Sequence, residues 1–403
     1  MPALARTPEE WSAAAVRLGH RTFHGKQIFR WIHVRGVTDA AHMTDLPAAL
    51  RDKLVSEEGL GGVLEIAQER RAADDTRKLL VKLHDGANVE TVLIPRVAGG
   101  KSTLPSPLAR NGQNATEDDV DADAAAVVDD EDEEHPFGYY EAQQEVTESV
   151  PFTQCISTQV GCAMGCVFCA SGVAGLKRQM GPDEIVAQVL AGRTRLDAGE
   201  RISNVVLMGM GEPLHNYDAT VRALRLLTHR EGIGLSSRKV TVSTSGLVPE
   251  IARLGEDFQG QIGLAISLHA ADDETRSRLM PINKKYPLDV LMKGLRAYPL
   301  PRRRRITIEY TLVSGKNDAP EEAKKLAKLL RGLPVKVNLI PMNPIEASSL
   351  GPPDFARVLA FQRILVDAGY SCFIRRRRGD EVAAACGQLA LLGAKPKVRV
   401  NRD

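Results

Sequence analysis

Apolar and polar positions follow two different periods along the chain, and the period changes repeatedly between residues 151 and 375. Short apolar runs, typical of buried strands, precede stretches in which apolar residues recur every three or four positions, as in helices. The expected strands are 155–159, 202–208, 239–244, 261–268, 305–313 and 335–340. The expected helices begin at Pro182, Tyr217, Pro249, Asp272 and Leu288, and two more span 320–331 and 353–368. Six such units predict an α/β fold, an incomplete TIM-like (β/α)6 barrel of parallel strands with helices outside.

The chain before this repeat is expected to form two smaller parts. Residues 1–55 are expected to form an N-terminal helical domain, in which Pro8 opens one helix and an apolar pattern around Ile28 marks another. Basic residues and aromatic residues alternate in this domain, which suits RNA contact, although we favour packing for the aromatic side chains. Residues 56–96 contain two alternating runs, 76–83 and 89–94, on either side of Asp85-Gly86. These runs predict a β-hairpin that links the helical domain to the barrel.

Two further segments differ from the rest in composition. Residues 97–150 are rich in Gly, Ser, Pro, Asn and Ala, and residues 117–134 hold eleven acidic residues and no basic one. A segment of this composition buries too little apolar surface to fold, so a disordered insertion is predicted. Its acidic run could imitate RNA electrostatically, but we favour an inert solvated loop. Residues 376–403 are expected to form a C-terminal loop and tail.

The remaining chain is basic. Without the acidic run, 53 Lys and Arg residues stand against 40 acidic residues. Arginines 302–305 and 375–378 would attract the phosphates of a polyanion, which makes nucleic acid the leading partner, although a solvated charged surface is an equally common reason for a single arginine run. The chain contains neither a signal-peptide pattern nor an apolar stretch near the ~20 residues of a membrane span. A cytoplasmic protein with no membrane partner is therefore expected.

Three of the six cysteines lie close together on the loop after the first expected strand. Cys162, Cys166 and Cys169 have the spacing C-x3-C-x2-C. Three thiolates on so short a loop can hold three irons of a [4Fe-4S] cluster and leave the fourth iron open to another ligand. A zinc site would need a fourth Cys or His at matching spacing, and none is near in sequence. A reducing compartment also argues against a structural disulfide framework.

This motif, with the aromatic Phe168 before its last cysteine, resembles the radical S-adenosylmethionine (SAM) superfamily. Gly209 to Pro213, at the end of the second expected strand, is similar to the GEP element of that superfamily. The resemblance implies that the open iron binds the amino and carboxylate groups of SAM. It also implies that the reduced cluster cleaves SAM to give a 5′-deoxyadenosyl radical, chemistry that belongs to the cofactor while the protein directs it.

Further motifs narrow the resemblance to the RlmN family of rRNA and tRNA adenine-C2 methyltransferases. They occupy residues 158–162, 208–214, 243–246, 265–270, 281–286, 338–344, 378–380 and 385–389, and so cover most of the chain outside the insertion. The resemblance implies adenosine 2503 of 23S rRNA and adenosine 37 of certain tRNAs as substrates. It also implies an electron donor such as flavodoxin or ferredoxin.

The family motifs imply a cofactor pocket at the carboxyl ends of the strands. The residues implied to bind SAM are Gly211, Glu212, Ser243, Ser267, Leu268, His269 and Asn343. Each falls at or just after an expected strand end, where a barrel places its binding residues. Taken alone, Ser243 or Asn343 would more often have a turn or capping role.

The same resemblance assigns three catalytic residues. Cys386 matches the cysteine that a first SAM methylates. After a second SAM supplies the radical, the resulting methylene carbon joins this cysteine to adenine C2. Cys155 matches the thiol that releases the product by forming a disulfide with Cys386, and Glu90 matches the base that takes the C2 proton. About fifty inserted residues separate Glu90 from Cys155, so Glu90 reaches the site only if the insertion loops out. Cys372 lies in an apolar run and is expected in the core.

Three alternatives remain open at this stage. A related activity of the same family methylates adenine C8 with the same cysteines. A second alternative is a zinc-dependent RNA-binding protein, which would need a fourth zinc ligand that this sequence lacks near the motif. Bound iron and sulfide would exclude it. A glycyl-radical activating enzyme shares the cluster but has no use for Cys155 and Cys386.

Overall fold

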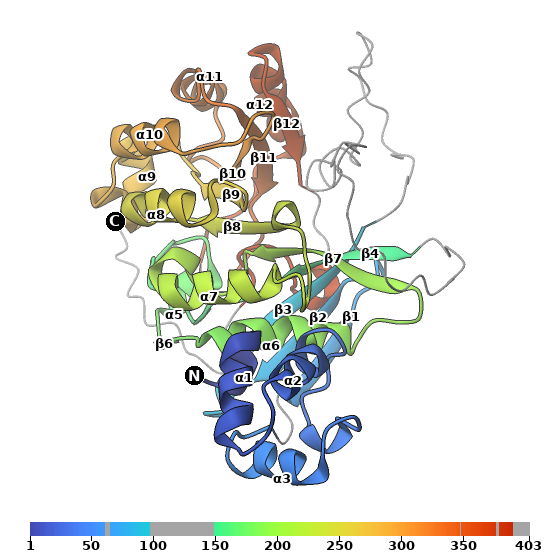
Figure 1. The fold of residues 1–403 in the computed structure, drawn as a ribbon. Coiled ribbons are helices and arrows are strands. Elements are labelled where there is room, and N and C mark those ends of the chain that lie inside the picture. The colour runs from blue at the N-terminus through green and yellow to red at the C-terminus, as the bar shows by residue number, and fades with distance from the viewer. Residues whose placement is uncertain (61–64, 97–148, 347, 376–378, 390–403) are drawn as a thin grey trace.

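The computed structural model describes residues 1–60, 65–96, 149–346, 348–375 and 379–389. Its centre is a ten-stranded sheet with the strand order β1-β2-β3-β4-β7-β8-β9-β10-β11-β12. Figure 1 shows helices α8 to α12 flanking strands β8 to β12, with the N-terminal helices gathered beside α6 at the other end of the molecule. Nearly all of the expected insertion and the end of the expected tail, 97–148 and 390–403, lie outside the described residues.

Seven neighbouring strands of the sheet run parallel. They are β4 (Val150–Cys155), β7 (Glu200–Leu207), β8 (Val240–Thr244), β9 (Gly263–Ser267), β10 (Ile306–Leu312), β11 (Val335–Pro341) and β12 (Ser371–Ile374). The helices between them are α6 (Pro182–Arg193), α7 (Tyr217–Leu227), α8 (Val248–Phe258), α9 (Asp273–Leu279), α10 (Leu288–Ala297), α11 (Pro320–Leu329) and α12 (Phe355–Asp367). The predicted α/β fold with an incomplete barrel is confirmed. Cys372 is buried in β12, as expected for a core thiol.

The first parallel strand differs from its expected position. It was expected at 155–159, but β4 ends at Cys155. Beyond that residue the backbone leaves the ladder, because the Ser157 N–H donates to the Gln188 side chain at 2.8 Å and the Thr158 N–H donates to the carbonyl of Met210 at 2.8 Å. The Gln188 side chain and the Met210 carbonyl thus accept from backbone donors that strand pairing would otherwise use.

The predicted hairpin is present, and it belongs to the same sheet as the barrel. Strands β2 (Arg77–Lys82) and β3 (Asn88–Pro95) pair antiparallel, and β1 (Glu65–Arg71) extends the hairpin on its outer edge. Strand β3 also pairs antiparallel with β4, which places Val92 opposite Cys155. Glu90, the expected base, therefore lies on β3, directly beside β4, the first strand of the barrel. The division of the chain into domains stays a prediction.

The N-terminal helices are α1 (Pro8–Arg17), α2 (Phe23–His33) and α3 (Ala48–Ser56). Thr7 and Glu10 form a capping box at the start of α1. On α2, Phe29 is fully buried as expected, whereas Phe23 is 49% exposed, so packing does not account for every aromatic residue here. Arg193 donates to the carbonyl of His33 at 2.9 Å and thereby joins α2 to α6. Across the described ranges, no helix is long and apolar enough to cross a membrane.

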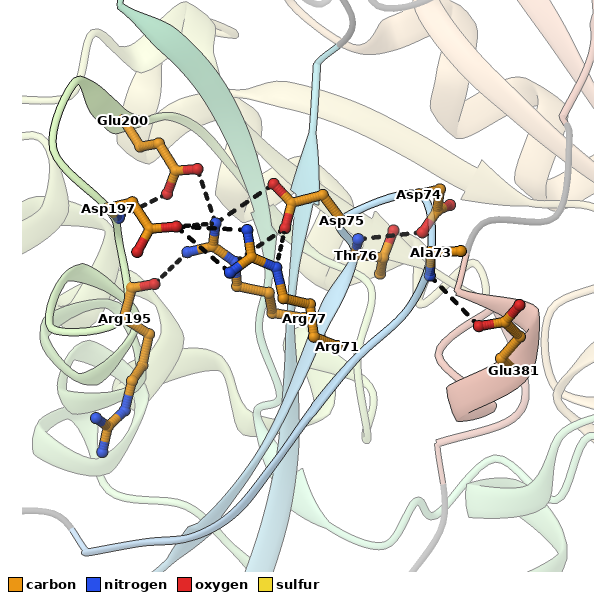
Figure 2. A network of polar contacts seen from close by, with 10 residues as sticks. All are labelled: Arg71, Ala73, Asp74, Asp75, Thr76, Arg77, Arg195, Asp197, Glu200 and Glu381. Carbon is orange, nitrogen blue, oxygen red and sulfur yellow. Dashed lines mark hydrogen bonds and ion pairs between the residues drawn. The ribbon is translucent and has the colours of Figure 1, made fainter.

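A buried guanidinium holds the hairpin to the barrel. Arg77 at the start of β2 is 1% exposed and donates to Glu200 at 2.7 Å and to Asp197 at 3.1 Å, both before or at the start of β7. Its side chain also contacts Asp75 in the β1–β2 turn and lies over the ring of Phe152. Figure 2 shows this guanidinium among the three carboxylates, and shows the same turn reaching toward Glu381 on the other side.

Substitution of Arg77 by methionine is expected to lower the free energy of unfolding by about 1 to 3 kcal/mol, because the shielded Glu200 carboxylate loses its donor while Asp75 and Asp197 stay accessible to water. Urea denaturation followed by circular dichroism measures this difference. The matched control is Arg71→Met, whose side chain is 52% exposed and shares Asp75 and Asp197. That change should cost at most about 1 kcal/mol. Equal losses for the two variants would contradict the assignment of Arg77 as the structural cation.

Candidate active site

A cleft opens at the carboxyl ends of the parallel strands, where a barrel of this kind binds ligands. It encloses about 960 Å³ of space free of protein atoms, part of it open to solvent. The expected site residues that line it are Cys162, Cys166, Cys169, Gly211, Glu212, Ser243, Ser267, His269, Asn343 and Cys386. The structure therefore brings together the cluster cysteines, most of the SAM motif and the expected methyl-carrying cysteine.

The loop with the three cysteines is fixed at both ends. Gly161 has a φ of +81°, and a Cβ there would lie 2.0 Å from the carbonyl oxygen of Gly175, so only glycine fits. The N–H of Cys162 donates to that same carbonyl at 3.3 Å. At the other end, the N–H of Val167 donates to the carbonyl of Leu279 at 3.2 Å. The short helix α5 (Ala170–Ala174) and the strand pair β5 (Gln159–Val160) and β6 (Arg178–Gln179) complete this framework.

The chemistry of the three thiols fits an iron–sulfur cluster. Burial raises the pKa of Cys162 to about 12 and also raises the pKa of Cys166 and Cys169, and the charges of Cys169 and Cys162 raise the pKa of Cys166 further. Bound iron would reverse this effect, since a metal cation stabilises thiolates. Among the residues that the structure describes, no three His, Cys, Asp or Glu side chains converge as a single metal ion requires. The three thiols nevertheless line one cleft, and they would be the residues that hold an iron–sulfur cluster.

The loop after β7 shows why its motif contains glycine and glutamate. Gly211 has a φ of +107°, and a Cβ there would lie 2.6 Å from the side chain of Gln159. The next residue, Glu212, is buried, and its carboxylate accepts hydrogen bonds from the N–H of Ser245 at 2.7 Å and of Leu214 at 3.1 Å. Burial raises the pKa of Glu212. Its carboxylate fixes the loop after β7 against the loop after β8.

The ends of β8 and β9 are joined by a buried arginine. Arg276 on α9 donates to the carbonyl of Ser245 at 2.7 Å and to that of Leu268 at 3.0 Å. The side chain of Leu268 is fully buried, Leu268 does not line the cleft, and its N–H donates to the carbonyl of Glu309 at 3.0 Å, so its expected contact with SAM stays a prediction. Ser267, one residue earlier, does line the cleft.

His269 is held as a neutral ring. Its Nδ1 accepts a hydrogen bond from the N–H of Thr311 at 2.8 Å, which leaves the proton on Nε2. Burial lowers the pKa of His269 to about 3, so the ring carries no charge near neutral pH. The ring of Phe168 in the cysteine loop contacts it edge-on, with centroids 4.8 Å apart. His269 can therefore donate one hydrogen bond to a ligand.

The segment that carries Cys386 closes one side of the cleft. Cys386 is exposed, and its carbonyl accepts a hydrogen bond from the Asn343 side chain at 2.9 Å. The Oδ1 atom of Asn343 is buried and has no hydrogen-bond partner among the described residues, so it is available to a ligand. The N–H of Ala170, directly after the last cluster cysteine, donates to the carbonyl of Gly387 at 2.8 Å. Asn343 thus contacts both the expected cofactor pocket and the Cys386 segment.

Glu90 and Cys155 are both buried and do not line the cleft. Glu90 on β3 is buried and forms an ion pair with Lys78 at 2.9 Å. Cys155 ends β4, and burial raises its pKa, with the charge of Cys386 as the next cause. Cys155 thus lies at the carboxyl end of β4, the end of the sheet at which Cys386 lines the cleft. All six cysteines are described and are free, so the expected Cys155–Cys386 disulfide is not supported as a bond of this structure.

Two charged side chains that line the cleft, those of Glu309 and Arg375, were not predicted as part of the pocket. Glu309 on β10 is buried and accepts a hydrogen bond from Asn338 at 2.9 Å, and the strand register places it in one row with Ser267 and Asn338. A carboxylate inside the apolar strand Ile306–Leu312 was the available signal, because such a group is rarely buried without a purpose. Arg375, expected to hold RNA phosphates, also lines the cleft. Arginines 376–378 lie outside the described residues.

The open parallel sheet and its three cysteines define the class of the protein. The family model described as the radical SAM superfamily matches residues 156–330, and the chain is a radical SAM enzyme. A solved radical SAM methyltransferase from Sphaerobacter thermophilus is 37% identical, with a TM-score of 0.79 over 96% of this chain and 99% of that one. The chain's cofactors are therefore a [4Fe-4S] cluster and SAM.

More specific similarities give the family. The family model described as the ribosomal RNA large subunit methyltransferase N-terminal domain matches residues 7–58. The dual-specificity RNA methyltransferase RlmN of Sorangium cellulosum (strain So ce56) is 66% identical over 98% of this chain and 97% of its own length. That of Syntrophobacter fumaroxidans (strain DSM 10017 / MPOB) is 41% identical over 94% of each chain. The chain belongs to the RlmN family.

Proposed function

We propose that the protein methylates C2 of adenine in RNA, at adenosine 2503 of 23S rRNA and adenosine 37 of tRNA. The observation that carries this proposal is the position of Cys386. Cys386 is an exposed residue that lines the same cleft as the three cluster cysteines, and Cys155 is a second, buried thiol at the end of β4. The relatives named above are called dual-specificity RNA methyltransferases, which supports RNA as the substrate.

The proposed cofactor roles follow the lining of the cleft. Cys162, Cys166 and Cys169 hold the cluster. SAM is held by Gly211, Glu212, Ser243, Ser267, His269 and Asn343, together with Leu268. When bound, the cluster and two molecules of SAM would supply the methyl group and the radical that removes a hydrogen atom from it. They would also accept the one unpaired electron that remains after the methylene carbon has bonded to the ring.

The residues of the chain itself perform the remaining steps. Cys386 accepts the methyl group on its sulfur, and the derived methylene carbon bonds to adenine C2. Glu90 accepts the C2 proton, and the electrons of that C–H bond restore the aromatic ring. Cys155 then attacks the Cys386 sulfur. The sulfur–methylene bond breaks, the carbon keeps the electron pair and takes up a proton, and a Cys155–Cys386 disulfide remains to be reduced by an external thiol.

This sequence of steps predicts a pH dependence for product release. The attacking Cys155 has a raised pKa, so near neutral pH nearly all of it is the unreactive thiol. Below that pKa the thiolate fraction rises about tenfold for each pH unit. Protein–RNA adduct formed at pH 7 and then shifted to pH 8 or 9 should therefore decay faster by about that factor per unit. A flat rate between pH 7 and 9, measured on denaturing gels, would argue against Cys155 as the attacking thiol.

Further parts of the proposal concern partners. A low-potential donor such as flavodoxin or ferredoxin reduces the cluster, and the protein works in the cytoplasm. The basic body of the chain supports RNA binding, because phosphate neutralisation releases counterions and strengthens association.

Nucleoside analysis of treated RNA tests the proposed function. The protein is reconstituted with iron and sulfide and incubated with SAM, a reductant and unmodified 23S rRNA fragment or tRNA. Digestion and mass spectrometry should then yield 2-methyladenosine. A C8-methylated nucleoside would instead show that the protein has the related activity, methylation of adenine C8 with the same cysteines. RNA without methylated adenine would refute the proposal.

A further inference from the structure

A single ammonium group connects the proposed base to the segment that carries Cys386. Lys78 on β2 contacts the Glu90 carboxylate at 2.9 Å and donates to the carbonyl of Ala383 at 3.2 Å. The side chains of Lys78 and Glu90 are 11% and 6% exposed. Ala383 lies three residues before Cys386 and has a left-handed backbone, with a φ of +49°. None of the family motifs described above includes Lys78.

The strand register places Lys78 on the same face of the sheet as Glu90 and Cys155. Lys78 pairs with Val92 on β3, and Val92 pairs with Cys155 on β4. Side chains in such a row lie on one face, and residues two apart on a strand share that face. Glu90, two residues from Val92, therefore lies on the same face as Lys78 and Cys155. The ion pair is a diagonal cross-strand contact between neighbouring strands.

The hairpin contacts the Cys386 segment at several points, and the Lys78 contact also involves the base, Glu90. In the β1–β2 turn, Asp74 accepts a hydrogen bond from the N–H of Gly379 at 3.1 Å. The N–H of Ala73 donates to the Glu381 carboxylate at 3.3 Å, and Figure 2 shows this contact across from the Arg77 ion pairs. Gly379 also lies against Thr76, since a Cβ there would be 2.9 Å from the Thr76 side chain. The segment that carries Cys386 is thus positioned on the hairpin that carries Glu90.

We propose that Lys78 is a positioning residue that sets the Glu90 carboxylate against the Cys386 segment. The base then faces adenine C2, which is joined to Cys386 through the methylene carbon. This inference rests on the proposed function. An ammonium group has three donors and serves both acceptors at once. A neutral side chain of similar length leaves a buried carboxylate and a carbonyl without their common partner.

The test compares three variants of the full-length reconstituted protein. Lys78→Met removes the ammonium group, Lys78→Arg keeps a cation with two or more donors, and Lys82→Met is the matched control. Lys82 lies on the same strand, pairs with Glu65 at 2.8 Å and is 47% exposed. Three quantities are measured: methyl on Cys386 without RNA, covalent protein–RNA adduct, and methylated adenine.

For Lys78→Met, methyl on Cys386 should stay within about twofold of the unaltered protein, while product formation falls about tenfold to a hundredfold, as for a misplaced general base. The adduct should accumulate, because it forms before Glu90 acts. Lys78→Arg should restore most of the product, and Lys82→Met should match the unaltered protein. Hydrogen exchange on the protein without cofactors should increase at residues 383–386 in Lys78→Met and not in Lys82→Met.

The outcomes separate this inference from the proposed function. If the unaltered protein fails to methylate Cys386, the proposed function is wrong whatever the variants do. If the unaltered protein works and Lys78→Met resolves the adduct at the unaltered rate, the role of Lys78 is refuted. Equal loss of Cys386 methylation in Lys78→Met and Lys78→Arg would also refute it, because a purely structural defect would then explain the result.

Discussion

Replacing Cys386 by alanine is expected to reduce RNA methylation by at least about a thousandfold, as for removal of a covalent nucleophile. The variant should still bind iron and sulfide and still cleave SAM upon reduction, because the three cluster cysteines are unchanged. Cys386 is exposed on a loop, so its truncation costs little packing. Methyl transfer is measured with labelled SAM, and SAM cleavage by chromatography of 5′-deoxyadenosine.

The matched control for this result is Cys372→Ala. Cys372 is a free thiol buried in β12 and does not line the cleft. Its replacement should leave methyl transfer nearly unchanged and lower stability only modestly. Undiminished methylation by the Cys386→Ala variant would exclude a cysteine-borne methyl group at this position.

Replacing Cys155 by alanine is expected to trap the protein covalently on its RNA. Methylation of Cys386 and bond formation to adenine precede the step that needs Cys155, so both should proceed. Released methylated adenine should fall by at least about a hundredfold, because no second thiol remains to attack the Cys386 sulfur.

Denaturing gels with labelled RNA measure the trapped complex. Nuclease digestion followed by mass spectrometry should find the adenine nucleotide on the Cys386 peptide. Combining Cys155→Ala with Cys386→Ala should abolish the complex. Normal turnover by Cys155→Ala without any complex would show that another group releases the product.

The parallel part of the sheet was predictable because its strands are buried on both faces. Their continuous apolar runs, each followed by a segment with helical periodicity, are compatible with few folds other than a parallel α/β sheet. Strand β1 was missed for the opposite reason. Its sequence, Glu65–Arg71, is almost entirely polar and its residues are largely exposed, so no alternation indicates a strand. Pairing with β2 alone makes this segment extended.

Local sequence carried little information about how the hairpin joins the barrel. The pairing of β3 with β4 connects residues separated by the long acidic segment, and such pairings depend on tertiary contacts. The buried cation Arg77 follows from the same packing, since its carboxylate partners Asp197 and Glu200 lie more than a hundred residues away. The position of Glu90 beside Cys155 could therefore be expected from the family resemblance but not from spacing.

The cleft itself was largely predictable, because a barrel collects binding residues at its strand ends and the motifs fall there. Leu268 shows the limit of this reasoning: it has the right position in the motif, but its side chain points into the core. Glu309 shows the reverse, since it lies in the middle of a strand yet faces the cleft. The contact of Asn343 with the Cys386 carbonyl joins two distant motifs and was not foreseeable from either.

Mass spectrometry of Cys386 tests the central claim most directly. The protein is purified and reconstituted anaerobically with iron and sulfide, incubated with SAM and reductant, and digested. The account predicts a methyl or methylene adduct on the peptide that contains Cys386, and none on the peptide with Cys372. An unmodified Cys386 in a preparation whose intact cluster cleaves SAM would contradict the account and leave a radical SAM enzyme with another route to its product.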